Sequence, residues 1–241
     1  MKQVTYDSSN LVTGRALRQP RGPLATSHAG PVLDRAPAVL TAVCGVVGTL
    51  CLIGSFRINP SPPADLSAAQ LVDWTVQHHT TIVLGGWLQG IGSLLTVLFA
   101  LALVHLAGAT HRFAGWATLL AGGAILLVSL VEVTFYLAAA QAAVAGDVAT
   151  GVIANALITA VQHVFLIAPA LLLPAGVVLL GSRVLPRGFA YSALVFGAVL
   201  QVLGLVGLFG VLQPVIDVLL IVQGVWFLAA ACTLLVRPIP A

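Results

Sequence analysis

The sequence predicts an all-α polytopic membrane protein, with six transmembrane helices in a bundle and a short interfacial helix in the first outer loop. Three observations predict this fold class. First, 59% of the 241 residues are hydrophobic and only 7% are charged, whereas roughly a quarter of the residues of a soluble domain are charged. Second, six apolar stretches each reach the roughly 20 residues that cross a bilayer. Third, these stretches are continuous and do not alternate with polar residues, which disfavours membrane strands.

The order of polar and apolar segments divides the chain into three parts. Residues 1–36 mix Ser, Thr, Pro, Gly and Arg without apolar periodicity, so we expect a disordered cytoplasmic tail there. Residues 37–236 form the predicted six-helix transmembrane domain, and residues 237–241 form a short cytoplasmic C-terminus. The predicted spans are residues 37–56, 80–107, 113–140, 150–181, 188–212 and 214–236.

Proline and glycine positions predict how the helices bend and pack. Pro169 and Pro174 should bend the fourth span, because a proline inside a helix removes a backbone hydrogen bond. Pro214 suits the first turn of the last span, where an amide hydrogen has no acceptor. Gly86 and Gly90 are spaced to lie on one helix face, so they permit a close approach of a neighbouring helix.

Positively charged residues predict the orientation of the spans. If both termini are cytoplasmic, every Lys and Arg residue except Arg57 lies on the cytoplasmic side, as the positive-inside rule requires. We therefore expect a multi-pass protein of the cell membrane with both termini in the cytoplasm. The pI near 9.1 comes from arginines in the tail and at loop ends, so it does not indicate a nucleic-acid binder.

The first outer loop carries a helix signal. Ser67 and Gln70 match a capping box, and the residues that follow alternate apolar side chains such as Val72 and Trp74 with polar ones such as Asp73. This pattern predicts a short helix on the membrane surface. The helix is either a lid over the bundle or an interfacial connector anchored by Trp74, and the connector is the commoner arrangement.

Polar side chains occur deep inside every predicted span except the first. At a rise of about 1.5 Å per residue, they lie about 12 to 20 Å from the outer helix ends; they are Gln89, Glu132, Gln162, His163, Gln201 and Gln223. Helical spacing adds further polar residues to these faces: Ser93 to that of Gln89, Ser129 and Tyr136 to that of Glu132, and Asn155 and Thr159 to that of Gln162 and His163. Because lipid cannot satisfy their hydrogen bonds, we expect these side chains to face inward and meet each other, water or a ligand.

Glu132 is the only acid deep within a predicted span. Burial without a cationic partner favours the neutral acid, which suits a proton donor or relay, so Glu132 is the candidate catalytic residue. The alternative is a structural acid that is hydrogen-bonded to His163, Gln162 or Tyr136. The histidines lack the spacing of a metal site, so we expect neither a metal nor a cofactor.

The polar layer favours a protein that binds or transports a small amphipathic molecule through an outward-facing cavity. The ligand's polar part would contact the candidate ligand-binding residues of the layer, and its apolar part would contact Trp87, Phe165 and Trp226. Membrane lipids and such a ligand are the expected partners.

Two other functions fit the same residues. A structural or regulatory partner without small-molecule chemistry would use the polar layer only to fix helix register. An intramembrane enzyme would use a neutral Glu132 to protonate a lipid-soluble, isoprenoid-type substrate, while aromatic rings stabilise the developing cation.

Four parts of the sequence carry a resemblance to a known group of proteins. They are Gly86-Trp87-Leu88-Gln89, Glu132, His163 with Pro169 and Pro174, and Leu185-Pro186-Arg187. Over about residues 37–236, the pattern resembles that of uncharacterised bacterial multi-pass membrane proteins grouped as domains of unknown function. The resemblance implies a six-span fold and a membrane location, and it implies no activity.

Overall fold

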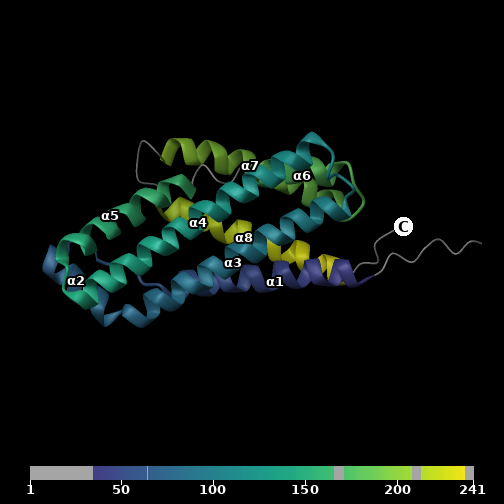
Figure 1. Ribbon diagram of the computed structural model, residues 1–241. Coiled ribbons are helices and arrows are strands. Elements are labelled where there is room, and N and C mark those ends of the chain that lie inside the picture. Colours follow the sequence, from purple (N-terminus) through teal and green to yellow (C-terminus); the bar gives the residue numbers. More distant parts are fainter. Residues whose placement is uncertain (1–34, 64, 166–170, 208–212, 237–241) are drawn as a thin grey trace, which may run out of the picture. The chain divides into compact units, whose positions relative to one another are not determined.

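The computed structural model describes residues 35–63, 65–165, 171–207 and 213–236. The secondary structure of these residues is entirely helical, which confirms the all-α class (Figure 1). The helices are α1 (Arg35–Ile58), α2 (Ala68–Gln77), α3 (His79–Leu106), α4 (Phe113–Ala145), α5 (Val148–Phe165), α6 (Leu172–Leu180), α7 (Arg187–Gly207) and α8 (Gln213–Val236). The predicted disordered tail and the predicted C-terminal segment lie outside the described residues, apart from the first two residues of α1.

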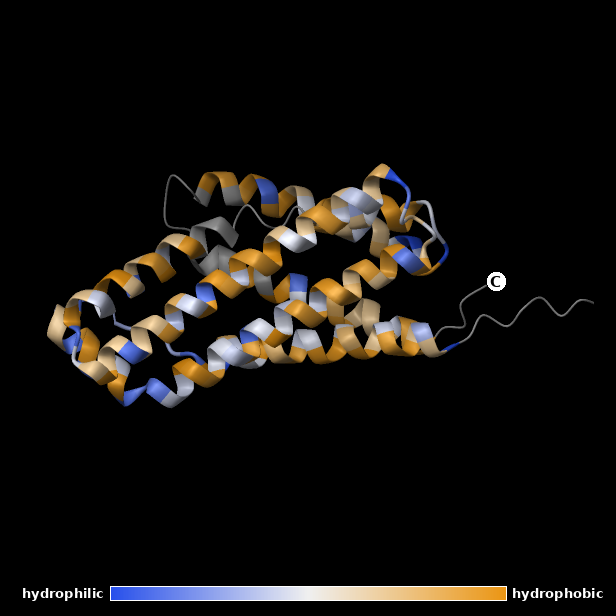
Figure 2. Cartoon of the chain, in the orientation of Figure 1, coloured by the Kyte–Doolittle hydropathy of each residue, from blue (hydrophilic) through white to orange (hydrophobic). Residues whose placement is uncertain are grey.

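Three of these helices have the length and composition of membrane spans. They are α1, α3 and α4, with 24, 28 and 33 residues, and Figure 2 shows hydrophobic residues along much of each. Shorter apolar helical segments cover Val148–Val161, Arg187–Leu203 and Ile221–Val236. The described residues thus contain three helices able to cross a membrane and three shorter apolar ones, and the six-span topology stays a prediction.

The predicted fourth span, residues 150–181, is described in two parts. Its described residues form α5 up to Phe165 and α6 from Leu172. Pro174 is the third residue of α6, where an amide hydrogen has no acceptor within the helix, so the proline is compatible with a helix start instead of a bend. The proposed bend at Pro169 lies outside the described residues.

The helix signal in the first outer loop is confirmed. Ser67 caps α2: its hydroxyl accepts from the Gln70 amide at 3.4 Å, and Gln70 Oε1 accepts from the Ser67 amide at 2.9 Å. Val72 and Thr75 are buried, and α2 packs against α4 and α5. His78 joins α2 to α3, with its ring stacked on Trp74 at a centroid distance of 4.4 Å. The connector is therefore fixed to the bundle by its own apolar face.

A close approach of two helix backbones occurs between α1 and α3, and not at the face of Gly86 and Gly90. A methyl group on Gly92 would stand 2.9 Å from the backbone nitrogen of Leu52, and one on Gly48 would stand 2.8 Å from that of Thr96. Gly86 and Gly90 instead face α4, at ordinary contact distances of 3.6 and 3.8 Å to the nearest side chains. Helical spacing shows that two glycines share a face, but it does not show which neighbour comes close.

The largest apolar core cluster of the described residues involves α1, α3, α6, α7 and α8. Within it, Phe99 is fully buried and its ring meets that of Phe227 edge to face at 6.0 Å. Phe227 in turn meets Trp226 at 5.3 Å, and Trp226 meets Phe189 at 6.0 Å. We call these four residues the aromatic core. Such edge-to-face pairs stabilise a core beyond the area that they bury.

The contrast between Gly92 and Gly90 yields a direct test. Gly92→Ala should lower the free energy of unfolding by about 1–3 kcal/mol, because a backbone atom has to move to admit the methyl group. Gly90→Ala, the matched control on the same helix, should be neutral or stabilising by up to about 1 kcal/mol, because alanine is the better helix former. Unfolding titrations in mixed micelles measure both. Equal effects of the two substitutions would contradict the packing described above.

Asp147 yields a second test, outside the apolar segments. Its carboxyl caps α5 by accepting from the Thr150 hydroxyl at 2.6 Å and from the Thr150 amide at 3.1 Å. These hydrogen bonds lower the pKa of the Asp147 carboxyl below its ordinary value of 3.8. A lowered folded-state pKa means that the charged cap stabilises the protein above the unfolded-state pKa, and that this contribution is lost as the pH falls through the folded-state pKa.

We therefore expect wild type to unfold at a higher temperature than Asp147→Asn at about pH 6, and the difference to shrink toward about pH 3. Unfolding midpoints at a series of pH values measure the difference. Asp73→Asn is the control, because the Asp73 carboxyl makes no hydrogen bond within the described residues. A difference for Asp147→Asn that stays constant with pH would show that the charge of the cap is unimportant.

Candidate functional site

The best-defined polar site lies between α3 and α4. Gln89 Nε2 donates a hydrogen bond to Glu132 Oε2, and the hydroxyls of Ser93 and Ser129 meet at 2.6 Å. From Gln89 to Ser93 the residue number rises by four along α3, whereas from Glu132 to Ser129 it falls by three along α4. The two residues of each helix therefore share one face, and the two helices run antiparallel. We call Gln89, Ser93, Ser129 and Glu132 the polar ladder.

The polar ladder is shielded from the surroundings. Each of its four residues is buried, and Glu132 is only 4% exposed. Tyr136, one turn further along α4, donates from its hydroxyl to Glu132 Oε1 at 3.3 Å. Both carboxyl oxygens of Glu132 therefore accept a hydrogen bond, one from each of two helices, which fixes the orientation of the carboxyl group.

This arrangement suits a group that gains and loses a proton. Gln89 and Tyr136 are neutral donors, so these two hydrogen bonds place no opposite charge beside the carboxyl. A tyrosine hydroxyl both donates and accepts, so Tyr136 can donate to the carboxylate and accept from the protonated acid. The contact between Glu132 and Tyr136 can therefore survive a change of protonation by reversing its direction.

Two buried threonine hydroxyls of the bundle have no hydrogen-bond partner within the described part of the chain. They belong to Thr96, one turn beyond Ser93 on α3, and to Thr49 on α1. Other threonines of the bundle, such as Thr41 and Thr118, donate to the carbonyl four residues earlier at 2.7 Å. Leaving a buried hydroxyl unpaired costs about 1–3 kcal/mol. These two positions therefore favour a polar partner that the described residues do not provide.

The two tryptophans proposed as ligand contacts lie away from the ladder. Trp87 is 59% exposed, because it precedes Gln89 by two residues and so points to nearly the opposite side of α3. Trp226 belongs to the aromatic core, and its Nε1 donates to Ser192 Oγ at 2.9 Å and to the Phe189 carbonyl at 3.3 Å. Phe99 of that core lies about 15 Å along α3 from Gln89.

On α5, the described candidates bond to their own helix. Asn155 Nδ2 donates to the Gly151 carbonyl at 2.9 Å, and Thr159 Oγ1 donates to the Asn155 carbonyl at 3.2 Å. Asn155 is half-buried and Thr159 is exposed, so the predicted inward stripe turns partly outward. The side chains of Gln162 and His163 lie outside the described residues, so their proposed contacts with Glu132 stay predictions.

The candidates on α7 and α8 are half-buried. Gln201 Oε1 is buried without a hydrogen-bond partner among the described residues. Gln223 precedes Gly224, which faces Thr49 of α1 at 3.8 Å. The structure thus joins Gln89, Glu132 and Tyr136 directly. The described contacts do not link Gln201 or Gln223 to that group.

Sequence reasoning missed parts of this site. It placed Ser93 and Ser129 on inward faces but did not pair them, since pairing depends on the register between α3 and α4. It also missed Thr49, although the neighbouring Gly48 signals a close helix contact. Among the described residues, no group of three or more His, Cys, Asp or Glu side chains is arranged to hold a metal ion.

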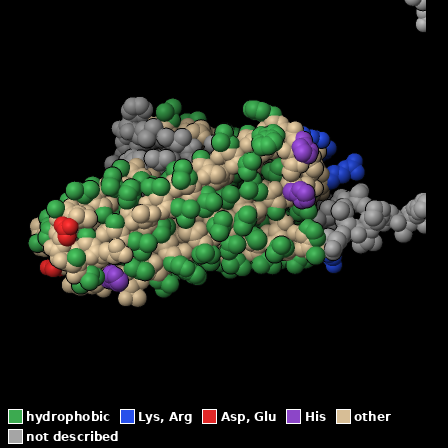
Figure 3. Space-filling model, in the orientation of Figure 1, with side chains coloured by type: hydrophobic (Ala, Val, Ile, Leu, Met, Phe, Trp, Pro, Cys, Tyr) green, Lys and Arg blue, Asp and Glu red, His purple; other side chains and the backbone are tan. Residues whose placement is uncertain are grey.

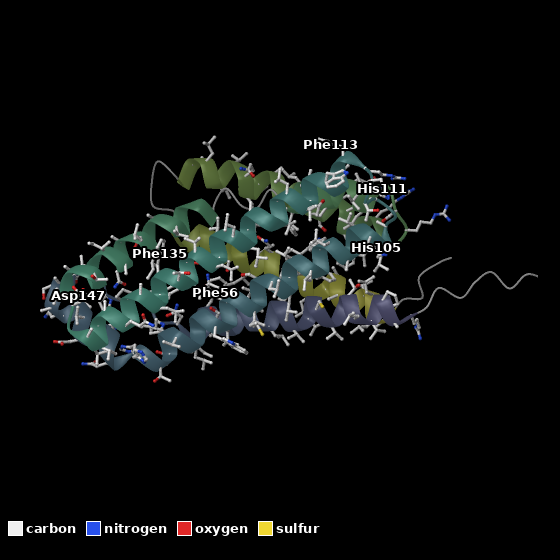
Figure 4. All side chains as sticks on the ribbon, in the orientation of Figure 1. Phe56, His105, His111, Phe113, Phe135 and Asp147 are labelled. Carbon is white, nitrogen blue, oxygen red and sulfur yellow. The ribbon has the colours of Figure 1, made fainter. Side chains whose placement is uncertain are left out.

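Figure 4 places Phe135 along the middle of the bundle, with His105, His111 and Phe113 near one end and Asp147 near the other. The ring of Phe135 packs with Tyr136 against an apolar cluster of Ala139, Ala154 and Ile158. The nearest described aromatic neighbours of the ladder are therefore on α4 itself.

Comparison with known proteins adds no family to this geometry. The chain matches no protein-family model, no curated protein and no solved structure. The resemblance to multi-pass proteins of unknown function stays a prediction, and the function has to be inferred from the buried site itself.

Proposed function

We propose that this chain is an integral membrane protein with six spans and both termini in the cytoplasm, and that it binds or transports a small amphipathic ligand at the polar ladder in a proton-dependent way. The observation that carries the proposal is the buried Glu132 carboxyl, hydrogen-bonded by Gln89 and Tyr136. The three long apolar helices support the membrane location.

The cost of burying an acid supports a functional role for Glu132. A charged side chain at the centre of a membrane helix costs at least about 2.5–3.5 kcal/mol, whereas an average hydrogen bond between membrane helices returns about 0.6 kcal/mol. By themselves, the hydrogen bonds from Gln89 and Tyr136 therefore return less than the cost of a permanent charge. Proton uptake removes the cost, so we infer that ligand binding and the protonation of Glu132 are coupled.

The surroundings of Glu132 suggest how a ligand would be held. Its polar part would replace Gln89 or Tyr136 as a hydrogen-bond partner of the carboxyl, and its apolar part would pack on Phe135 between α4 and α5. Access would be from the α2 side of the bundle, because Phe99 and the aromatic core lie at the other end of the stripe that begins with Gln89.

A second function is favoured by one specific observation. Gln89–Glu132 and Ser93–Ser129 link the same two helices on consecutive turns, as in a device that fixes helix register. These two hydrogen-bonded pairs would be sufficient for a structural or regulatory protein that binds no small molecule. By contrast, the exposed Trp87 and the distant Trp226 give no common aromatic lining for the enzymatic alternative.

Glu132→Gln separates binding from a structural role. The substitution keeps the shape of the side chain and resembles the protonated acid, with one acceptor oxygen and one donor group, but it removes the titration. We expect small amphipathic molecules that copurify with wild type in native membrane discs to fall about ten-fold or more, because a hydrogen bond to a charged group contributes about 1.5–3 kcal/mol. Mass spectrometry of extracted small molecules gives the measurement.

Thr118→Ala is the matched control on α4, because the buried Thr118 hydroxyl lies outside the ladder and donates to the Ala114 carbonyl of its own helix, so this variant should retain these molecules. Unfolding midpoints check that both variants are folded. If neither wild type nor the variants carry a small molecule, and Glu132→Gln changes only the midpoint, the binding proposal is wrong and the structural function remains.

The Ser93–Ser129 pair allows a separate measurement of how much the polar ladder contributes to the free energy of unfolding. In a double-mutant cycle, Ser93→Ala and Ser129→Ala should be coupled by about 0.6 kcal/mol, the typical value for a hydrogen bond between membrane helices. Unfolding in mixed micelles supplies the four free energies. Strictly additive effects would mean that the two hydroxyls do not bond to each other.

A further inference from the structure

Apart from Arg57 in the last turn of α1, the exposed charges of the described bundle divide between its two ends. Arg35, Arg112, Arg183 and Arg187 occupy the end where α1 and α4 begin and where α6 connects to α7. We call this the arginine end. Asp65, Asp73 and Asp147 lie at the opposite end, and Figure 3 shows the basic and acidic side chains gathered at separate ends.

The turn between α6 and α7 lines an open cavity at the arginine end. The cavity has a volume of about 430 Å³, and its lining includes Gly181, Ser182, Arg183, Pro186 and Arg187. Such a volume falls in the size range of small-molecule sites.

The turn is held in place from both sides. Val184 and Leu185 are buried in the apolar core. The Ser182 amide and hydroxyl both donate to the Leu179 carbonyl, at 3.1 and 3.2 Å. The Phe189 amide donates to the Pro186 carbonyl at 2.9 Å. The cavity is therefore built by a fixed backbone and not by a loosely attached loop.

Three guanidinium groups surround this turn. Arg183 and Arg187 line the cavity, and Arg112 Nη1 lies 3.2 Å from the position that a methyl group on Gly181 would take. All three residues are exposed, and none makes an ion pair or a side-chain hydrogen bond within the described ranges. Guanidinium groups match phosphate oxygens with paired donors. The start of α7 adds the positive end of a helix dipole.

Exposed aromatic residues indicate the depth of this site. Phe113 and Trp116 at the start of α4 are 88% and 59% exposed, and Tyr191 near the start of α7 is also exposed. Aromatic side chains gather at the level of lipid headgroups, where one edge is apolar and the other is wet. The three arginines therefore lie where a lipid phosphate would lie.

We propose that the α6–α7 turn binds the phosphate group of an anionic lipid, with Arg183 and Arg187 as its main contacts and Arg112 at its rim. This site is separate from the polar ladder, and it does not depend on the function proposed for Glu132. Basic pockets beside membrane helices recognise anionic headgroups through the same chemistry.

Titration of the full chain with phosphatidylglycerol or phosphatidylcholine in detergent micelles, read by native mass spectrometry, tests this site. Wild type should prefer phosphatidylglycerol. Each arginine near the membrane surface contributes about five-fold, so Arg183→Gln with Arg187→Gln should weaken phosphatidylglycerol binding about 25-fold. Arg112→Gln alone should weaken it up to about five-fold, which keeps the test decisive if the double variant does not fold.

Arg35→Gln is the matched control, because it removes one cation from the same end on α1, which packs on α3 and α8. It should change the affinity less than about two-fold. If Arg35→Gln lowered phosphatidylglycerol affinity as much as Arg112→Gln does, the binding would be general charge attraction and the proposed site would be wrong. The proposal would also be wrong if wild type bound phosphatidylglycerol and phosphatidylcholine equally well. Binding of inorganic phosphate alone, in competition with the lipid and dependent on Arg183 and Arg187, would overturn the lipid as the source of the phosphate.

Discussion

The hydrogen bond between Gln89 and Glu132 constrains the described bundle more than any other contact. A carboxyl group buried among apolar helices needs donors from within the protein, because lipid offers none. Only one register of α3 against α4 brings Gln89 to Glu132, and a shift of one residue would turn Gln89 by about 100° toward another surface. Ser93 and Ser129 repeat the link one turn further along. The polar groups therefore set the register, and the apolar side chains fill the space around them.

That register also determines what the other sides of α3 can contact. With Gln89 and Ser93 turned to α4, Gly92 turns to α1, where the two backbones approach too closely for any larger side chain. Phe99 then enters the aromatic core with Phe227. Helix α3 thus presents polar side chains to α4, a glycine to α1 and the ring of Phe99 to the aromatic core. The polar stripe that begins at Gln89 thus ends at a fully buried ring.

Much of this could be predicted from the sequence, because helical periodicity fixes which residues share a face. It predicted the helical class, the Ser67 cap, and the common face of Gln89 and Ser93. Depth along a helix, however, does not give the direction of a side chain, so Trp87 was grouped with Gln89 although two residues of helix turn it away. The partners of Trp226 belong to α7, which helix spacing alone does not reveal. Pro174 was ambiguous for a related reason, since a proline fits both a bend and a helix start.

The arginine end of the bundle has an ordered arrangement of arginines that membrane orientation alone does not require. The positive-inside rule counts Lys and Arg residues near the spans without regard to their arrangement, so arginines in a long tail would serve it equally well. Arg183 and Arg187 instead flank a turn that is anchored by buried Val184 and Leu185. Two guanidinium groups on the same anchored turn offer an anion more than one charge-assisted donor. The turn therefore suits the proposed recognition of an anion, which would separate the chemistry of this end from the proton coupling proposed for Glu132.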